Sequence, residues 1–256
     1  MAPKKHLVLD VVGTCVSFTA FYAQIARTLG PRLLAHNISP AHFGYTWKEA
    51  AELEFYLLLQ SERGLPYPRV LAAVFARTLV MAGVPAGPVR AGAFASREER
   101  DVCVRAYTDG LELRDGCREM VERLRGEGWL VWCLTSGEKG RVKGYFEKGG
   151  LVMEEERIVS CAELGERMGT GQGALYKPCL AAYRAVLGLF AEEDEKWFGA
   201  AHMWDVSAAV KAGFRGAYCS IYDQDPCAEI FDTETMDVMA ETLPEMADKM
   251  IALTSP

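Results

Sequence analysis

The chain has 256 residues; half of them are hydrophobic and a quarter are charged, which is typical of globular proteins. This length allows one large domain or a core with an insertion. The formal net charge of −7 disfavours nucleic acids and anionic membranes as partners, because both would repel the protein. No apolar run approaches the roughly 18 residues that span a membrane. Asp10 interrupts the first apolar run too early for a secretion signal. We therefore expect a soluble, cytoplasmic protein.

The cysteines point to the same compartment. The chain contains eight, none of them in a CxxC pair, and several fall inside apolar runs such as LVWCLTS and GAYCSIY. Such a distribution is typical of buried free thiols in a reducing environment. We expect neither disulfides nor a catalytic cysteine.

The N-terminal part begins with one strand and continues with helices. The run LVLDVVGTCVSF, residues 7–18, predicts a buried strand that ends near Asp10 and breaks at Gly13. Between residues 17 and about 108 the patterns are helical and no strand is convincing. The Pro/Gly-rich stretch MAGVPAGPVRAGAF, residues 81–94, predicts a loop between two of these helices.

After residue 110, strands and helices alternate. The strands are expected at LVWCLTS, ERIVSC, KWFGAAH and RGAYCSIY, and the helices at CREMVERLRGEG, KPCLAAYRAVLGLF and WDVSAAVKAGF, before a final short strand and helix. We place Pro178 near the first turn of its helix, where proline is tolerated. The alternation predicts an α/β fold, a Rossmann-like parallel sheet with helices on both faces. Residues 1–16 and 110–256 form the expected core domain, and residues 17–109 an inserted all-helical cap domain.

Polar residues follow four of the predicted strands or precede the next helix. They are Asp10 to Thr14, then Thr135-Ser136-Gly137, then Lys177, and finally His202 and Asp205. Ligands of parallel sheets bind beyond the carboxyl ends of the strands, so these side chains predict a site. Each one alone has a simpler interpretation: Asp10 or Asp205 as a cap, Lys177 as a surface residue, and His202 as a packed strand end.

The order of these segments carries a family resemblance. LDVVGT, CLTSG, YKPCLAAY and HMWDVSAAVKAGF resemble, in order, the four motifs of the haloacid dehalogenase (HAD) superfamily. Within it, the chain is most similar to the type II 2-haloacid dehalogenases. Their "YKP....Y" pattern is matched by Tyr183, six residues after Lys177, and YTW around Trp47 resembles a motif of their cap. The resemblance covers nearly the whole chain.

The resemblance implies a hydrolase in which Asp10 is a covalent nucleophile. Lys177 would keep Asp10 ionised, and Asp205 would hold Lys177 or position the hydrolytic water. Thr14 and Thr135 would supply hydroxyl hydrogen bonds. The residues implied in substrate binding are Val12, Ser136, Tyr183, His202, Trp47 and Ser39. The expected partner is a small-molecule substrate. The family also implies that no cofactor is needed and that a homodimer is possible.

Departures from the family bear on the substrate. Phosphatases of the superfamily place an acid two residues after the nucleophile, where Val12 stands here and cannot donate a proton. The dehalogenases have an aromatic residue at this place. Their anion-binding arginine, eight residues before the tryptophan, is replaced by Ser39. Their second-motif asparagine is Ser136, and two fourth-motif residues are Ala200 and His202.

Several functions are therefore compatible with the sequence. The leading one is hydrolytic cleavage of a carbon–halogen bond, or of another bond with an easy leaving group. A Mg²⁺-dependent phosphotransfer enzyme would hold its metal at Asp10 and Asp205. A carbon–phosphorus hydrolase would need a Schiff-base lysine, for which Lys48 is the sole cap candidate. A non-catalytic ligand-binding descendant is the fourth.

Overall fold

The computed structural model describes residues 3–167, 169 and 175–254. The chain divides into two compact units. The core unit comprises Met1–Ser17 and Leu113–Pro256, and the helical unit comprises Phe18–Glu112. The domain boundaries expected from the sequence, 16/17 and 109/110, lie next to these positions.

The core unit contains a six-stranded sheet with the order β5-β4-β1-β6-β7-β8, and each pair of neighbours is parallel. Its strands are β1 (Lys5–Leu9), β4 (Trp129–Thr135), β5 (Ile158–Ser160), β6 (Glu195–Ala200), β7 (Arg215–Cys219) and β8 (Val238–Ala240). β1 lies in the middle, where Leu7, Val8 and Leu9 are fully buried. Burial of successive residues on both faces of a strand is what the continuous apolar run predicts.

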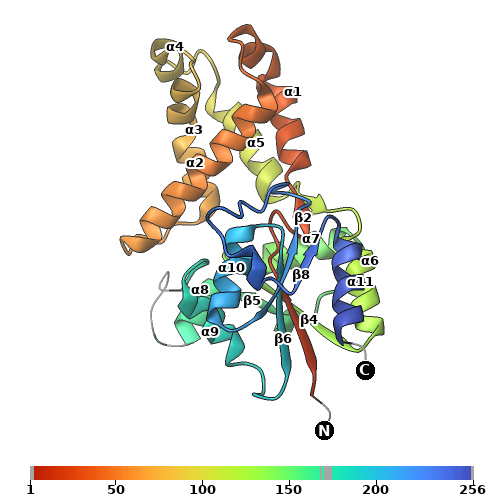
Figure 1. Ribbon diagram of the computed structural model, residues 1–256. Helices are drawn as coiled ribbons and strands as arrows, with labels where there is room; N and C mark the ends of the chain where they lie inside the picture. The colour runs from red at the N-terminus through yellow and green to blue at the C-terminus, as the bar shows by residue number, and fades with distance from the viewer. Residues whose placement is uncertain (1–2, 168, 170–174, 255–256) are drawn as a thin grey trace. The chain divides into compact units, whose positions relative to one another are not determined.

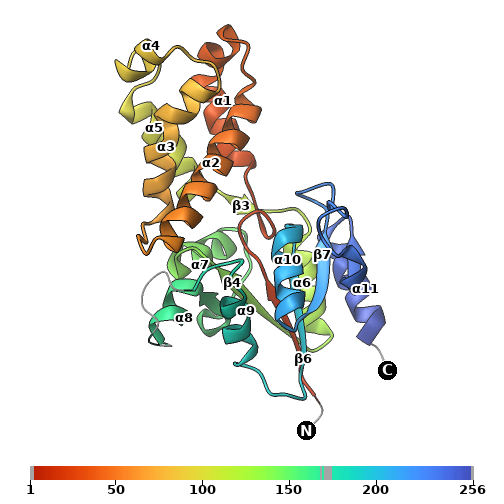
Figure 2. The ribbon, with the colours of Figure 1, turned by 60° about the vertical axis from the view of Figure 1, so that its left-hand side comes forward.

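Helices cover both faces of this sheet. They are α6 (Cys117–Gly126), α7 (Lys139–Lys148), α8 (Cys161–Arg167), α9 (Leu180–Leu187), α10 (Met203–Ala212) and α11 (Leu243–Thr254). α6 and α11 run side by side on one face, while α9 packs against α10 on the other (Figures 1 and 2). The α/β fold expected from the sequence is confirmed.

The strand order places β1 at the point where the chain changes direction across the sheet. From β1 the chain proceeds to β4 and β5 on one side, and then crosses to β6, β7 and β8 on the other. The carboxyl end of β1 is therefore the topological switch point, where open parallel sheets bind ligands. Asp10 is the first residue after β1.

The helical unit consists of α1 (Thr19–Ala35), α2 (Pro40–Gln60), α3 (Tyr67–Met81), α4 (Ala86–Arg90) and α5 (Arg97–Thr108). α5 begins with a capping box, in which Ser96 and Glu99 satisfy each other's backbone N–H groups. The centre of the unit is aromatic: Phe21, Phe43 and Phe75 surround Trp47, whose indole N–H donates to the carbonyl of Leu71 at 2.8 Å.

Short elements complete the chain. β2 (Val16–Ser17) pairs with β3 (Glu112–Leu113) in a two-stranded sheet, where the chain passes between the units. Two 3₁₀ turns, η1 (Glu155–Arg157) and η2 (Thr233–Thr235), precede β5 and β8. Among the described residues, no helix has the length and apolar character needed to cross a membrane.

Two local predictions were wrong. The stretch expected to be a loop contains α4, which begins after Pro85 and includes Pro88. Prolines are tolerated there because the first N–H groups of a helix have no intrahelical partner. The helix expected to begin at Lys177 starts three residues later, so Pro178 lies just before its first turn. α9 starts at Leu180, after a turn closed by the N–H of Cys179 and the carbonyl of Tyr176 at 2.8 Å.

Candidate active site

The loop after β1 begins with Asp10 and then turns back, so that Thr14 contacts the Asp10 carboxylate. The backbone N–H of Asp10 donates to the carbonyl of Gly199 on β6 at 3.0 Å, which continues the sheet by one residue. The chain then reverses at Gly13, whose φ of 96° suits glycine. This reversal lets the Thr14 hydroxyl donate to Asp10 Oδ2 at 2.7 Å while it accepts from the N–H of Ala201 at 2.8 Å.

Lys177 bridges two buried carboxylates. Its Nζ lies 2.5 Å from Asp10 Oδ1 and 2.5 Å from Asp205 Oδ2. Lys177 is 3% exposed, Asp10 6% and Asp205 0%, so all three charges are removed from water. Buried charges are tolerated only when they are paired and hydrogen-bonded, and here each charge has a partner of opposite sign.

Asp205 is held in this arrangement by a second donor. The Tyr183 hydroxyl donates to Asp205 Oδ1, and the Tyr183 ring packs edge-on against Phe198 of β6. Asp205 lies inside the first turn of α10, while His202 occupies the N-cap position. The simpler interpretation of Asp205 as a helix cap is therefore wrong, because both of its carboxylate oxygens bond to side chains.

The electrostatics keep Asp10 ionised. Burial alone would raise the pKa of Asp10, but the charge and hydrogen bond of Lys177, with help from His202 and Thr14, hold it below its usual value. Burial and the neighbouring Asp10 raise the pKa of Asp205. Burial would lower the pKa of Lys177, but the two carboxylates raise it instead, so the ammonium persists. Burial and Asp205 raise the pKa of Tyr183, which stays a donor.

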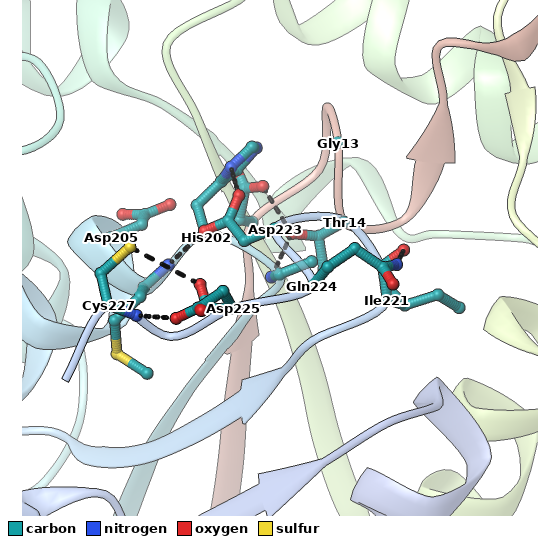
Figure 3. A network of polar contacts seen from close by, with 12 residues as sticks. Gly13, Thr14, His202, Asp205, Ile221, Asp223, Gln224, Asp225 and Cys227 are labelled. Atoms are coloured by element: carbon teal, nitrogen blue, oxygen red, sulfur yellow. Dashed lines mark hydrogen bonds and ion pairs between the residues drawn. The ribbon is translucent and has the colours of Figure 1, made fainter. Parts of the chain in front are cut away.

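His202 belongs to a second polar group, drawn in Figure 3. Its Nδ1 lies 3.2 Å from Asp223 Oδ1, and its Nε2 lies 3.4 Å from the carbonyl of Val12. The other oxygen of Asp223 accepts from the N–H of Met203 at 2.9 Å, which caps α10. The simpler interpretation of His202 as only a packed strand end is therefore incomplete. Sequence reasoning missed Asp223, because it follows the fourth motif by a strand and lies in an acidic loop without periodicity.

The end of β4 forms a third part of the edge. Thr135 Oγ1 accepts from the N–H of Gly137 at 3.0 Å, and Ser160 donates to the carbonyl of Gly137 at 3.1 Å. The Ser136 hydroxyl is buried beside the Cys161 thiol, without a hydrogen bond of normal geometry to any described residue. Arg141, on the first turn of α7, lies against Gly137. Arg141 was not among the predicted site residues.

The structure thus brings together most of the predicted residues at one sheet edge. Three of the remaining candidates lie in the helical unit. Trp47 is fully buried in the aromatic centre of that unit, which favours packing over substrate contact. Ser39 is the N-cap of α2 and accepts from the N–H of His42 at 3.4 Å. Lys48 donates to Glu49 at 2.6 Å and Glu52 at 3.1 Å; an ammonium in this setting is unsuited to Schiff-base formation, which needs a neutral amine.

Asp10 and Asp205 do not fit a Mg²⁺ site as they lie here. The Lys177 ammonium stands between them, at hydrogen-bond distance from one oxygen of each. Mg²⁺ prefers oxygen ligands in octahedral geometry, and no group of three or more His, Cys, Asp or Glu side chains suited to a metal occurs among residues 3–167, 169 and 175–254. We derive no step through a metal.

The cysteines are free thiols in the structure. Six are buried, Cys179 is partly buried and Cys227 is exposed. Burial raises the pKa of Cys103, Cys161 and Cys219 to about 11, which disfavours thiolate chemistry at neutral pH.

Comparison with known proteins supports the fold. No protein-family model matches the sequence, and no curated protein matches it. Solved structures do match. L-2-haloacid dehalogenase RSc1362 aligns with a TM-score of 0.73 and 14% identity, over 97% of this chain and 98% of that one. L-2-haloacid dehalogenase from Xanthobacter autotrophicus aligns with a TM-score of 0.69 and 16% identity, over 99% and 100%. A dehalogenase with an intermediate complex aligns with a TM-score of 0.70 and 16% identity, over 100% and 99%.

These matches cover both units of the chain, and nearly the whole of each matched protein. The chain therefore has the fold of the haloacid dehalogenases, as the motif resemblance implies. At 13–18% identity the likeness extends to the fold and no further, since one fold supports many activities.

Proposed function

We propose that the protein is a hydrolase that cleaves a carbon–halogen bond with Asp10 as the covalent nucleophile. The observation that carries this proposal is the setting of Asp10: a buried carboxylate at the switch point of the sheet, fixed by Lys177 at 2.5 Å and Thr14 at 2.7 Å. A carboxylate that is ionised, oriented and shielded from water is suited to displacement at carbon.

In the first step, an oxygen of Asp10 attacks the carbon that carries the halogen. A carbon–oxygen bond forms, the carbon–halogen bond breaks, and the halide leaves with the electron pair. Halide needs no proton on departure, so Val12 at the acid position of the phosphatases is no obstacle. Phosphate ester cleavage needs a protonated leaving group, and the side chain of Val12 has no proton to give.

In the second step, water attacks Cγ of the ester and forms a tetrahedral species. The bond from Cγ to the alkyl oxygen then breaks, and that oxygen takes up the proton removed from the attacking water and leaves as the alcohol, while the new carboxyl group of Asp10 releases the second proton. The regenerated Asp10 carboxylate keeps one oxygen from water. Overall, the halogenated substrate and water are converted into an alcohol, a halide ion and a proton.

We assign to His202 the role of taking the proton from that water. A ring that holds one proton donates it from Nδ1 to Asp223 and leaves Nε2 as the basic nitrogen. After proton transfer, both nitrogens face acceptors, Asp223 and the carbonyl of Val12. Asp205 is less suited to this role because both of its oxygens already accept from Lys177 and Tyr183. Its role is to position Lys177.

The test is halide release from a panel of 2-haloacids by the wild type and by Asp10→Asn. We expect release by the wild type and a loss of about 10⁴-fold or more in the variant, because an amide is not a nucleophile for this displacement. Asp232→Asn, which changes an exposed carboxylate of the core unit, is the control and should release halide at the wild-type rate. Equal release by wild type and Asp10→Asn would contradict the proposal.

A further inference from the structure

Arg141 is a partly buried cation for which the described residues supply no carboxylate partner. Two of its guanidinium nitrogens, Nε and Nη1, have almost no exposed surface, and neither has a hydrogen-bond partner within the described part of the chain. Leaving a buried charged donor unpaired is costly, because it loses its hydrogen bonds to water without replacement. Proteins keep such groups mainly where a ligand completes them.

A second arginine of the core unit shows the ordinary arrangement. The Nε of Arg125 is also buried and unpaired, but its other nitrogens bond to the carbonyl of Val152 at 2.8 Å and to Glu154 at 3.2 Å. Arg125 is therefore held by a carboxylate of the chain itself. No corresponding carboxylate holds Arg141 among the residues described.

Arg141 lies at the candidate active site. A Cβ placed on Gly137 would lie 2.6 Å from Nη2 of Arg141 and 3.3 Å from Oγ1 of Thr135. The guanidinium therefore flanks the turn after β4, on the side of the Thr135 hydroxyl. The glycine at 137 lets the guanidinium lie close to the backbone of this turn. The N-cap residue of α7, Glu138, makes no side-chain hydrogen bond to the helix start, and the free N–H groups of that turn add to the attraction for an anion.

The charges of the site call for a cation at this place. Asp10, Lys177 and Asp205 sum to one negative charge, and Lys177 already donates to both carboxylates. The His202–Asp223 pair adds no net positive charge. An anionic substrate would bring a second negative charge into a buried site, which is unfavourable without a compensating cation. Ser39, at the place of the dehalogenase arginine, supplies none.

We propose that Arg141 binds the carboxylate of the substrate beside Thr135 and Ser136, so that the site selects 2-substituted carboxylic acids over their neutral analogues. This assignment rests on the proposed function for its choice of site. The planar guanidinium offers two parallel N–H donors to a carboxylate. The cation that the dehalogenases bring from their cap is supplied here by a helix of the core unit, four residues after Gly137.

The experiment measures binding of propanoate, an unreactive monocarboxylate, and of propanamide, its neutral analogue, by calorimetry. The proteins are the wild type, Arg141→Gln and Lys143→Gln. The control removes the same charge from the same helix two residues on, where Lys143 is half-exposed and lies near Glu147 and Glu155. We expect Arg141→Gln to weaken propanoate binding about tenfold or more, with propanamide unchanged, and Lys143→Gln to stay within about twofold.

A thermal measurement separates binding from folding. Removing an unpaired buried charge should leave the melting temperature of Arg141→Gln equal to or above that of the wild type. Propanoate should raise the melting temperature of the wild type and not that of the variant. Equal propanoate affinity in all three proteins, an equal loss for propanamide, or no propanoate binding by the wild type would each overturn the assignment.

The outcome is distinguishable from failure of the proposed function. Halide release that depends on Asp10, with propanoate binding indifferent to Arg141, would keep the hydrolase and remove this anion site. Propanoate binding that depends on Arg141, without halide release from any 2-haloacid, would keep the anion site and remove the dehalogenase.

Discussion

Two parts of the same sheet edge differ in how far the protein satisfies its own polar groups. At the end of β1, the Asp10–Lys177–Asp205–Tyr183 network is closed, since each charge and hydroxyl has a partner within the chain. At the end of β4, Ser136 and two nitrogens of Arg141 are buried without a hydrogen bond of normal geometry to the described residues. A closed network is rigid before any ligand arrives, which suits a nucleophile that must be held in place. Donors without a partner in the described chain, such as those of Arg141 and Ser136, are suited to binding a substrate.

This difference between the two regions indicates at which positions substitutions are tolerated. The chain keeps every member of the closed network that the dehalogenase motifs imply, while Ser39, Ser136 and His202 depart from them. Replacing one member of a closed buried network leaves an uncompensated charge. Replacing a side chain outside this network leaves no charge of the network without its partner.

The largest effect on this comparison is expected from Lys177→Met. Without the ammonium, two buried carboxylates face each other unpaired, so unfolding should become easier by about 3–5 kcal/mol at pH 7, and halide release should be lost. Chemical denaturation measures the stability. Lys143→Met, on an exposed helix face, should stay within about 0.5 kcal/mol of the wild type.

The pH dependence of the same variant has a definite sign. In the wild type, the pKa of Asp10 is lowered, so its contribution to stability is present above about pH 4 and is lost as the pH falls through the folded-state value. The pKa of Lys177 is raised, so its contribution is present below about pH 10 and is lost above it. In Lys177→Met the carboxylates gain by protonation, and stability should rise as the pH falls from 7 to 5. A fall over that range in the variant would mean that Lys177 does not pair these carboxylates.

His202→Asn should divide the two chemical steps. Formation of the ester needs no base, so Asp10 should still be alkylated, while hydrolysis slows by about 10²–10⁴-fold. Denaturing mass spectrometry of the protein during turnover should show the mass of the alkylated chain in the variant and little of it in the wild type. Asp223→Asn should slow hydrolysis less, since Asp223 orients the ring and does not itself take the proton. Unchanged hydrolysis in His202→Asn would assign the base elsewhere.

The smallest effects come from removing one hydroxyl in each region. Tyr183→Phe deletes the hydrogen bond to the Asp205 carboxylate and should cost about 1.5–3 kcal/mol of unfolding free energy, with the ring still packed on Phe198. Ser136→Ala removes a buried hydroxyl that makes no hydrogen bond of normal geometry to the described residues. The free energy of unfolding should stay unchanged or rise slightly. If both substitutions cost the same, the two regions do not differ as described.

The closed network was predictable from the sequence, while of the open region only Ser136 was predicted and Arg141 was not. Asp10, Lys177 and Asp205 lie next to apolar runs of a predicted parallel sheet, and the carboxyl ends of parallel strands meet at one edge. Tyr183 was named because it stands six residues after Lys177, as in the dehalogenase pattern. Arg141 carries no such signal, because an arginine in the first turn of a charged helix reads as solvent-exposed. Asp223 carries no motif of its own, because it lies in an acidic loop four residues after the end of β7. The turn before α9, which places Lys177 inward, was mistaken for helix since Pro178 suits both.

The most direct test of the account is one turnover in H₂¹⁸O with excess enzyme over L-2-chloropropanoate. If Asp10 forms the ester and water attacks its Cγ, the ¹⁸O should appear in the peptide that contains Asp10, and the first alcohol released should carry none. Halide release with ¹⁸O in the alcohol and none in that peptide would mean that water attacks the substrate directly, which contradicts the nucleophilic role of Asp10.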